Sequence, residues 1–263
     1  MSNIVMVFSP HPDDAEYYAG GTIAKMIQEG AKAYIVIVTD GRVGSFEFDS
    51  QRLVPIRSEE ARRAAQVLGA EPPIFLGHPD MGLDQLKPGL LREQFIRLIR
   101  QYQPDIVIAE DAFTGFEVHP DHRAVAWAAS DAVNSAMLPL AHPEHLTEGL
   151  EPHFVREKYF YTDQIDAANK IVDISQTMSV KLAALAEHKS QMRFLVEGVL
   201  RQAEAAGINA QAIAGEALKE PTTAVSWAMQ VQAAKVGQKT NVQYGEAFRY
   251  ARFHPFVEGL IKQ

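Results

Sequence analysis

The sequence contains no cysteine among its 263 residues. Disulfide bonds and thiolate metal ligands are therefore excluded, so any bound metal needs nitrogen and oxygen ligands. Basic residues are also few, because 25 lysines and arginines against 33 acidic residues give a formal net charge of −8. No basic run occurs anywhere in the chain. This balance argues against nucleic acid or an anionic membrane as the main partner.

Long apolar runs are missing as well. No stretch approaches the roughly 18–20 apolar residues that cross a bilayer. The first residues lead into a strand without a basic segment, an apolar core or a cleavage site, so we expect a cytoplasmic protein. No Gly-x-Gly-x-x-Gly follows a predicted strand, which removes the fingerprint of a dinucleotide-binding protein.

Strand and helix patterns alternate through the first half of the chain. Short apolar runs predict strands at 4–8, 33–39, 73–76 and 105–109, and helical periodicity predicts helices at 17–27, 55–68, 89–102 and from 123 onward. This order with short connections predicts an α/β protein with a Rossmann-like three-layer fold and a mostly parallel sheet. Gly20 and Gly21 lie inside the first helix, where they favour close helix–sheet packing.

The second half is richer in helices. Strand signals occur at 159–161 and 171–174, and helical patterns follow at 177–189, 192–206, 210–218 and 225–236. No linker or repeat divides the chain, so we expect one domain over 1–263 with helical additions at about 190–240. The alanine-rich additions favour packing against the parent domain or a neighbouring subunit. A homo-oligomer, such as a trimer or hexamer, is therefore expected.

Residues 9–16, Ser-Pro-His-Pro-Asp-Asp-Ala-Glu, lie between the first predicted strand and its helix. Ligands of open α/β sheets collect at the carboxyl ends of strands. His11 and Asp14 are three residues apart and can converge on one point if the helix has begun there. Asp13 must then point elsewhere, so one acid is suited to a metal and the other to a proton. The alternative is that both acids cap the helix.

Residues 118–122, Val-His-Pro-Asp-His, repeat this arrangement after the predicted strand at 105–109. His119 and His122 again lie three residues apart, beside a proline and an acid. Two such clusters, each after a strand and before a helix, belong on the same edge of one sheet. The residues alone indicate that one of these histidines binds a metal, without deciding which.

The two motifs, at 10–16 and 119–122, resemble those of the LmbE-like (PIG-L) family of zinc-dependent N-acetylglucosaminyl deacetylases. Further segments fit the same family, and the resemblance runs from about Asn3 to about Arg249. These segments are Thr39-Asp40-Gly41, Arg57-x-x-Glu60, Pro79 to Leu83, His188 to Gln191, and Tyr244 to Arg249.

The resemblance implies a zinc site with an open position for water. It assigns the metal ligands to His11, Asp14 and His122, and the general base to Asp13. Nitrogen and oxygen ligands accept several divalent ions, so Fe²⁺ or another metal stays open beside zinc.

The resemblance also assigns supporting roles. His119 is expected to stabilise the tetrahedral intermediate and Asp121 to orient His119, while Arg57 and Asp80 are expected to contact the substrate. A structural salt bridge or a helix-start charge is the alternative for Arg57 and Asp80. After addition, Asp13 or His119 can deliver the proton that the departing amine needs.

One departure concerns the tyrosine that some relatives carry just before the second motif. Glu117-Val118 stands there in this chain. Help in stabilising the oxyanion, the role of that tyrosine in relatives, is then left to a tyrosine such as Tyr161 or Tyr244. The main prediction is a metal-dependent hydrolase that removes an acetyl group from an N-acetylated amino sugar or its conjugate. The alternatives are a zinc amidase on another small amide, such as a thiol-sugar conjugate, and a non-catalytic metal centre closed by His119.

Overall fold

The structure is a computed structural model that describes residues 3–115, 117–209 and 220–261. The helix predicted at 210–218 lies outside the described residues. Among the described residues, no helix is both long and apolar enough to cross a membrane.

Within the described residues, seven strands form one sheet in the order β3-β2-β1-β4-β5-β7-β6. The strands are β1 (Ile4–Ser9), β2 (Lys32–Thr39), β3 (Ile74–His78), β4 (Ile106–Glu110), β5 (Glu157–Tyr161), β6 (Lys170–Asp173) and β7 (Gly245–Ala251). β1 to β5 pair in parallel, whereas β7 runs antiparallel to both β5 and β6. The predicted Rossmann-like α/β fold with a mostly parallel sheet is confirmed, although β7 was not predicted as a strand.

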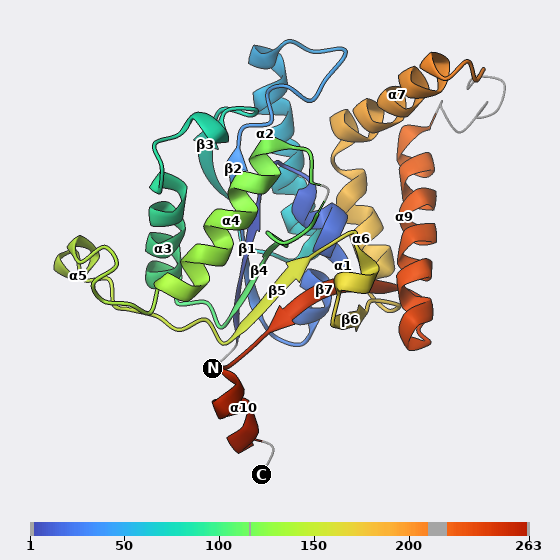
Figure 1. Cartoon of the computed structure of the whole chain (residues 1–263). Helices are drawn as coiled ribbons and strands as arrows, with labels where there is room; N and C mark the ends of the chain where they lie inside the picture. The colour runs from blue at the N-terminus through green and yellow to red at the C-terminus, as the bar shows by residue number, and fades with distance from the viewer. Residues whose placement is uncertain (1–2, 116, 210–219, 262–263) are drawn as a thin grey trace.

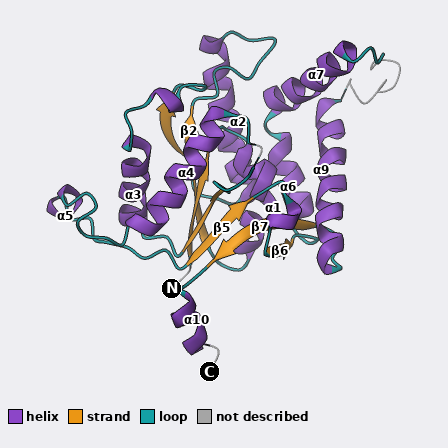
Figure 2. Ribbon diagram, in the orientation of Figure 1, coloured by secondary structure: helices purple, strands orange, loops and turns teal. Residues whose placement is uncertain are grey.

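Helices cover both faces of the sheet (Figures 1 and 2). The α-helices are α1 (Asp14–Gln28), α2 (Ser50–Leu68), α3 (Leu90–Tyr102), α4 (Pro120–Ser135), α5 (Glu144–Thr147), α6 (Met178–Ala186), α7 (Lys189–Ala205), α9 (Pro221–Gly237) and α10 (Pro255–Ile261). Short 3-10 turns occur at η1 (Leu83–Gln85), η2 (Ile165–Ala167) and η4 (Gln238–Thr240).

The alternation of side chains along β1 creates the two apolar layers. Val5 and Val7 face one layer, where they join the buried faces of α1, α2 and α6. Met6 and Phe8 face the other layer, where they join α3 and α4. Because both faces are covered, β1 reads as a continuous apolar run rather than an alternating one.

The helices after β6 pack against the parent fold. Met192 of α7 and Met229 of α9 lie in one apolar cluster with Ile174, which follows β6. Gly21 explains how closely this layer approaches α1, because a Cβ atom there would come within 2.8 Å of the Ile174 side chain. The close packing predicted for the glycine pair is present, but its partner is the segment after β6 rather than the sheet.

Helix α2 begins at Ser50, several residues before the predicted start at Pro55. The side chain of Asp49 accepts a hydrogen bond from the Arg52 backbone N–H and so caps the earlier start. Pro55 therefore lies inside the helix, near its beginning. The predicted start of α2 is too late because it assumes that Pro55 occupies the first turn of the helix.

Candidate metal centre

Two strand-to-helix turns meet where the strand order reverses. β1 lies between β2 and β4. The helix that follows β1 packs on one face of the sheet, and the helix that follows β4 packs on the other face. The residues after these two strands lie at the topological switch point, where α/β sheets bind ligands. His11 and Asp14 come from the turn after β1, and His122 comes from the first turn of α4.

The β1–α1 turn is held by short-range hydrogen bonds. The Ser9 hydroxyl donates to the His11 carbonyl oxygen at 2.7 Å and accepts from the Ala15 N–H at 3.1 Å. The Thr39 hydroxyl at the end of β2 donates to the Pro10 carbonyl oxygen at 2.9 Å. These bonds fix the backbone on both sides of His11.

Three donor atoms form a nearly equilateral triangle at the switch point. His11 Nδ1 lies 3.1 Å from Asp14 Oδ2 and 3.2 Å from His122 Nε2, and the last two atoms are 3.4 Å apart. Tetrahedral zinc with bonds of about 2.0–2.1 Å requires ligand atoms about 3.3–3.4 Å apart. The separations present in the structure therefore fit a tetrahedral metal ion with one position left open.

The other nitrogen of each histidine faces a carboxylate. His122 Nδ1 lies 2.7 Å from Oε2 of Glu110, and His11 Nε2 lies 3.1 Å from Oδ1 of Asp80. Metal-binding histidines commonly donate their second ring N–H to such a group, which fixes the ring and its tautomer. The pattern supports His11 Nδ1 and His122 Nε2 as the atoms that face a metal.

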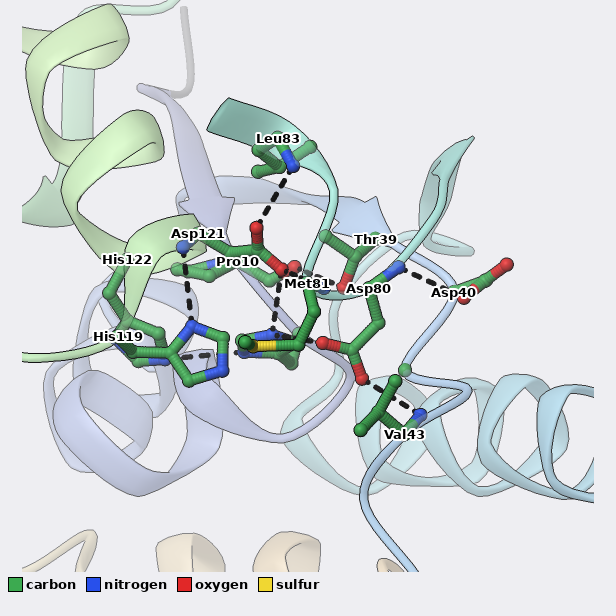
Figure 3. Close-up of polar contacts among 12 residues, drawn as sticks. Pro10, Thr39, Asp40, Val43, Asp80, Met81, Leu83, His119, Asp121 and His122 are labelled. Atoms are coloured by element: carbon green, nitrogen blue, oxygen red, sulfur yellow. Dashed lines mark hydrogen bonds and ion pairs between the residues drawn. The ribbon is translucent and has the colours of Figure 1, made fainter. Parts of the chain in front are cut away.

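A second set of candidate ligands lies on the opposite side of His11. His11, His119, Asp80 and Asp121 also bring donor atoms close together. The carboxylate of Asp121 is fully buried, and it accepts hydrogen bonds from the backbone N–H groups of Met81 and Leu83 at 2.6 and 3.0 Å. Figure 3 shows that Asp80 and Asp121 tie the loop after β3 to the site. Both carboxylates also bind neighbouring main chain, since Asp80 accepts a 3.0 Å hydrogen bond from the Val43 N–H.

Asp13 and Asp14 point to different partners. Asp13 Oδ1 accepts a 2.7 Å hydrogen bond from Arg57, which also donates to the carbonyl oxygens of Pro12 and Gly41. The Asp13 backbone has φ of 138°, in a region that non-glycine residues rarely occupy. Its side chain makes no capping hydrogen bond to α1, so capping does not explain it. Burial raises the pKa of Asp13 to about 6, although Arg57 opposes this shift.

His119 caps α4 with its ring. Its Nδ1 accepts a 3.2 Å hydrogen bond from the Asp121 backbone N–H, which implies a neutral ring with its proton on Nε2. Burial and the neighbouring His11 and His122 lower the pKa of His119, in agreement with that state. Asp121 was expected to orient His119, and the structure has its main-chain N–H on the His119 ring. The Asp121 carboxylate has its Oδ2 3.5 Å from His11 Nε2.

Negative charge exceeds positive charge around the triangle. The carboxylates in this region belong to Asp13, Asp14, Asp80, Glu110 and Asp121. Burial alone would lower the pKa of His122, but Asp14 and Glu110 raise it to about 9. Burial likewise lowers the pKa of His11, and Asp121, Asp14 and Asp80 outweigh that effect. A site that favours protonated histidines in this way favours a bound cation.

A cavity of about 370 Å³ opens onto these residues. The three triangle residues line it, and so do Asp13, Arg57, Asp80 and His119. Arg57 and Asp80 therefore reach the cavity, although each also holds a site residue: Arg57 holds Asp13, and Asp80 holds His11. Tyr161 and Tyr244 are not among the residues that line it.

Sequence reasoning missed Glu110. This carboxylate ends β4, is 5% exposed and contacts His122. The sequence could have indicated Glu110, because an acid directly after the apolar run at 105–109 is expected on the same sheet edge as the metal motifs. Glu117 was considered only because it stands where some relatives carry a tyrosine. Its carboxylate accepts a hydrogen bond from the His119 backbone N–H and lies 4.0 Å from His122 Nδ1.

The fold and the cluster define a class: a Rossmann-like α/β protein with a candidate metal centre at its switch point. The family model described as PIG-L: GlcNAc-PI de-N-acetylase matches residues 6–133. Diacetylchitobiose deacetylase of Thermococcus kodakarensis is 35% identical over 189 residues, covering 71% of this chain and 69% of that protein.

Two further comparisons agree with this match. A probable N-acetyl-alpha-D-glucosaminyl L-malate deacetylase 2 of Bacillus anthracis is 28% identical over 207 residues, covering 76% of this chain and 86% of the relative. The solved N,N'-diacetylchitobiose deacetylase of Pyrococcus horikoshii, in complex with its inhibitor MPG, superposes with a TM-score of 0.78 at 28% identity. That superposition covers 98% of this chain and 88% of the other. The chain belongs to the PIG-L (LmbE-like) family, as its two motifs predicted.

Proposed function

We propose that the protein is a zinc-dependent hydrolase that removes the acetyl group from the amine of an N-acetylated amino sugar or its conjugate. One observation carries the proposal: the donor triangle of His11, Asp14 and His122 lies in one cavity with Asp13. The related proteins, which are named as deacetylases of N-acetylated sugars, support the substrate class.

His11, Asp14 and His122 would hold the metal. Zinc bound there would polarise the acetyl carbonyl group and make water more acidic. The same nitrogen and oxygen ligands suit Fe²⁺, so zinc is the proposal and iron is its closest competitor. Glu110 and Asp80 would orient His122 and His11 through their second ring nitrogens.

Asp13 would act as the general base. It takes a proton from the attacking water while the water oxygen bonds to the acetyl carbon. The carbon–nitrogen bond then breaks, and the proton passes to the departing amine, which leaves acetate and a free amino sugar. The hydrogen bond from Arg57 keeps the Asp13 carboxylate in one orientation, and such orientation favours proton transfer.

His119 would stabilise the carbonyl oxygen as it becomes negative. Its Nδ1 is engaged by the start of α4, so its remaining N–H donor is on Nε2. A neutral donor in a partly buried site stabilises such an oxygen without a change in its own protonation. Asp121 supports this geometry by anchoring the loop after β3, and Arg57 and Asp80 remain the proposed substrate contacts.

The direct test is release of free amine from N-acetylglucosamine, N,N'-diacetylchitobiose and N-acetylglucosaminyl malate. We expect zinc-loaded protein to release amine from at least one substrate, a chelator to abolish the release, and added zinc to restore it. Release that survives complete removal of metal would overturn the zinc mechanism. Silence across the panel with one zinc bound per chain would overturn the proposed reaction and favour another amide or a non-catalytic centre.

We also propose one domain over 1–263, a cytoplasmic location and a homo-oligomer. The packing of α7 and α9 on the segment after β6 supports the first proposal. Exposed Phe256 and Leu260 on α10 support a subunit contact, because exposed apolar side chains on one helix favour association. Light scattering after size-exclusion chromatography gives the mass directly, and a monomer at all concentrations would contradict the oligomer.

A further inference from the structure

A second cavity adjoins the one that holds the candidate metal centre. It has a volume of about 450 Å³, and Tyr17 and Tyr18 line both cavities. The Tyr18 ring lies 6.4 Å from the His122 ring and stacks on Tyr161 at 4.6 Å. One aromatic ring, that of Tyr18, therefore lies between the second cavity and a proposed metal ligand. Its volume is within the roughly 300–1,000 Å³ of small-molecule sites.

The position of this cavity in the fold also suits a ligand. It lies at the carboxyl end of β5 and the first residues of β7, under one face of α9. The candidate metal centre lies at the carboxyl ends of β1 and β4 in the same sheet. The two cavities therefore lie along one edge of the sheet, and Tyr17 and Tyr18 line both.

The lining combines aromatic faces with hydrogen-bonding groups. Trp227 on α9 is 68% exposed, so a large indole surface is open at the rim. Asp163 and Gln232 are joined by a 3.3 Å hydrogen bond and offer both acceptors and donors. Tyr161 also lines the cavity, and its ring is held by stacking on Tyr18.

The charge of the lining selects among ligands. Two carboxylates (Asp163 and Glu246) and two ammonium groups (Lys181 and Lys235) line the cavity, so its formal charges cancel. Lys181 Nζ is already engaged, because it lies 2.5 Å from Glu246 Oε1. An anionic group would need a positive surface, which this cavity does not offer. Aromatic faces and paired donors and acceptors suit a neutral ring that carries hydroxyl groups.

We propose that this second cavity binds a neutral sugar ring joined to the amino sugar whose acetyl group is removed. The inference rests on the proposed function for the site of reaction, but it adds a binding site of its own. The preferred substrate is then a disaccharide or longer neutral glycoside. A single N-acetylglucosamine, or a conjugate with an acidic group such as malate, would leave the cavity unfilled or poorly matched.

The two tryptophans of the chain provide a direct binding test. Trp127→Phe leaves Trp227 as the only tryptophan, and Trp227→Phe leaves Trp127, which does not line the cavity, as the matched control. Both variants also carry Asp13→Asn, which should block removal of the acetyl group, and the zinc-loaded proteins are titrated with the neutral sugars N,N'-diacetylchitobiose and N-acetylglucosamine. We expect a saturable change of Trp227 emission with N,N'-diacetylchitobiose alone, and no change of Trp127 emission. Unchanged Trp227 emission, or an equal response to N-acetylglucosamine, would overturn the inference.

Kinetics provide the second test. Trp227→Ala should lower the preference for diacetylchitobiose over N-acetylglucosamine, measured as the ratio of kcat/KM values, by about tenfold. Gln232→Ala should lower the same ratio, whereas Gln230→Ala, on the same helix but outside the cavity, should keep it. A wild-type ratio in both cavity variants, or a wild-type preference for N-acetylglucosaminyl malate, would contradict the inference. If no substrate releases amine while Trp227 still responds to N,N'-diacetylchitobiose, the proposed reaction fails and the sugar site stands.

Discussion

Two buried clusters of charge contact α1, and they differ in how their charges are balanced. Around His11, at the start of α1, carboxylates outnumber the cations that face them. At the middle of α1, Lys181 and Glu246 pair at 2.5 Å, and Glu246 also accepts hydrogen bonds from the backbone N–H groups of Gly21 and Thr22. The first cluster leaves negative charge for a cation, whereas the second satisfies itself. Buried charge that lacks a partner indicates the site of chemistry, whereas a balanced buried ion pair connects elements of the fold.

Asp13→Asn gives the sharpest contrast between the two clusters. The amide cannot accept the proton of water, so kcat should fall about 10³–10⁴-fold. Zinc should stay bound, since Asp13 lies outside the donor triangle. Amine release and metal analysis by mass spectrometry measure the two properties on one sample. The exposed Asp131→Asn on α4 is the matched control and should keep wild-type activity; zinc loss from Asp13→Asn would contradict the division of roles.

Lys181→Met should affect stability instead. It leaves Glu246 buried without its cation, and the free energy of unfolding should fall by about 3–5 kcal/mol. Urea denaturation of the zinc-loaded protein measures this difference. Lys239→Met removes an exposed lysine that pairs with Asp166, and its effect should stay within about 1 kcal/mol. Equal free energies of unfolding in the two variants would show that the buried Lys181–Glu246 pair does not stabilise the fold.

Glu110→Gln should have the smallest effect of the three. His122 would lose its charged partner while the donor triangle stays intact, so the dissociation constant for zinc should rise about 10–100-fold. Competition with a fluorescent zinc chelator measures that constant. Glu144→Gln removes a carboxylate that lies 2.9 Å from His142, away from the triangle, and should leave zinc affinity unchanged. An unchanged dissociation constant in Glu110→Gln would remove Glu110 from the site.

The parts that local sequence determines were predictable. β1, β2 and β4 are buried on both faces, and their apolar runs identify them directly. The two motifs that contain His11, Asp14 and His122 could be placed on one sheet edge because each lies between a strand and a helix of one parallel sheet, whereas the choice of His122 over His119 came from the family resemblance. The separate directions of Asp13 and Asp14 follow from their adjacency in a turn.

The parts that depend on distant contacts were not predictable. β7 begins with Gly245 and the buried Glu246, whose partner Lys181 is 65 residues away, so no apolar pattern reveals it. The hydrogen bonds from Arg57 to Pro12 and Asp13 require the packing of α2 against the first turn, which no local pattern predicts. Likewise, Asp121 faces His11 only because the loop after β3 supplies two backbone donors.

The location of zinc in crystals of the zinc-loaded protein, found by anomalous scattering, tests the central claim most directly. We predict one ion about 2.0–2.2 Å from His11 Nδ1, Asp14 Oδ2 and His122 Nε2. An ion on the other side of the ring, bound by His11 Nε2 together with Asp80 and Asp121, would contradict the account. In that case the carboxylates that hold the loop after β3 would be the metal ligands, and the proposed role of Asp13 would fall with the triangle.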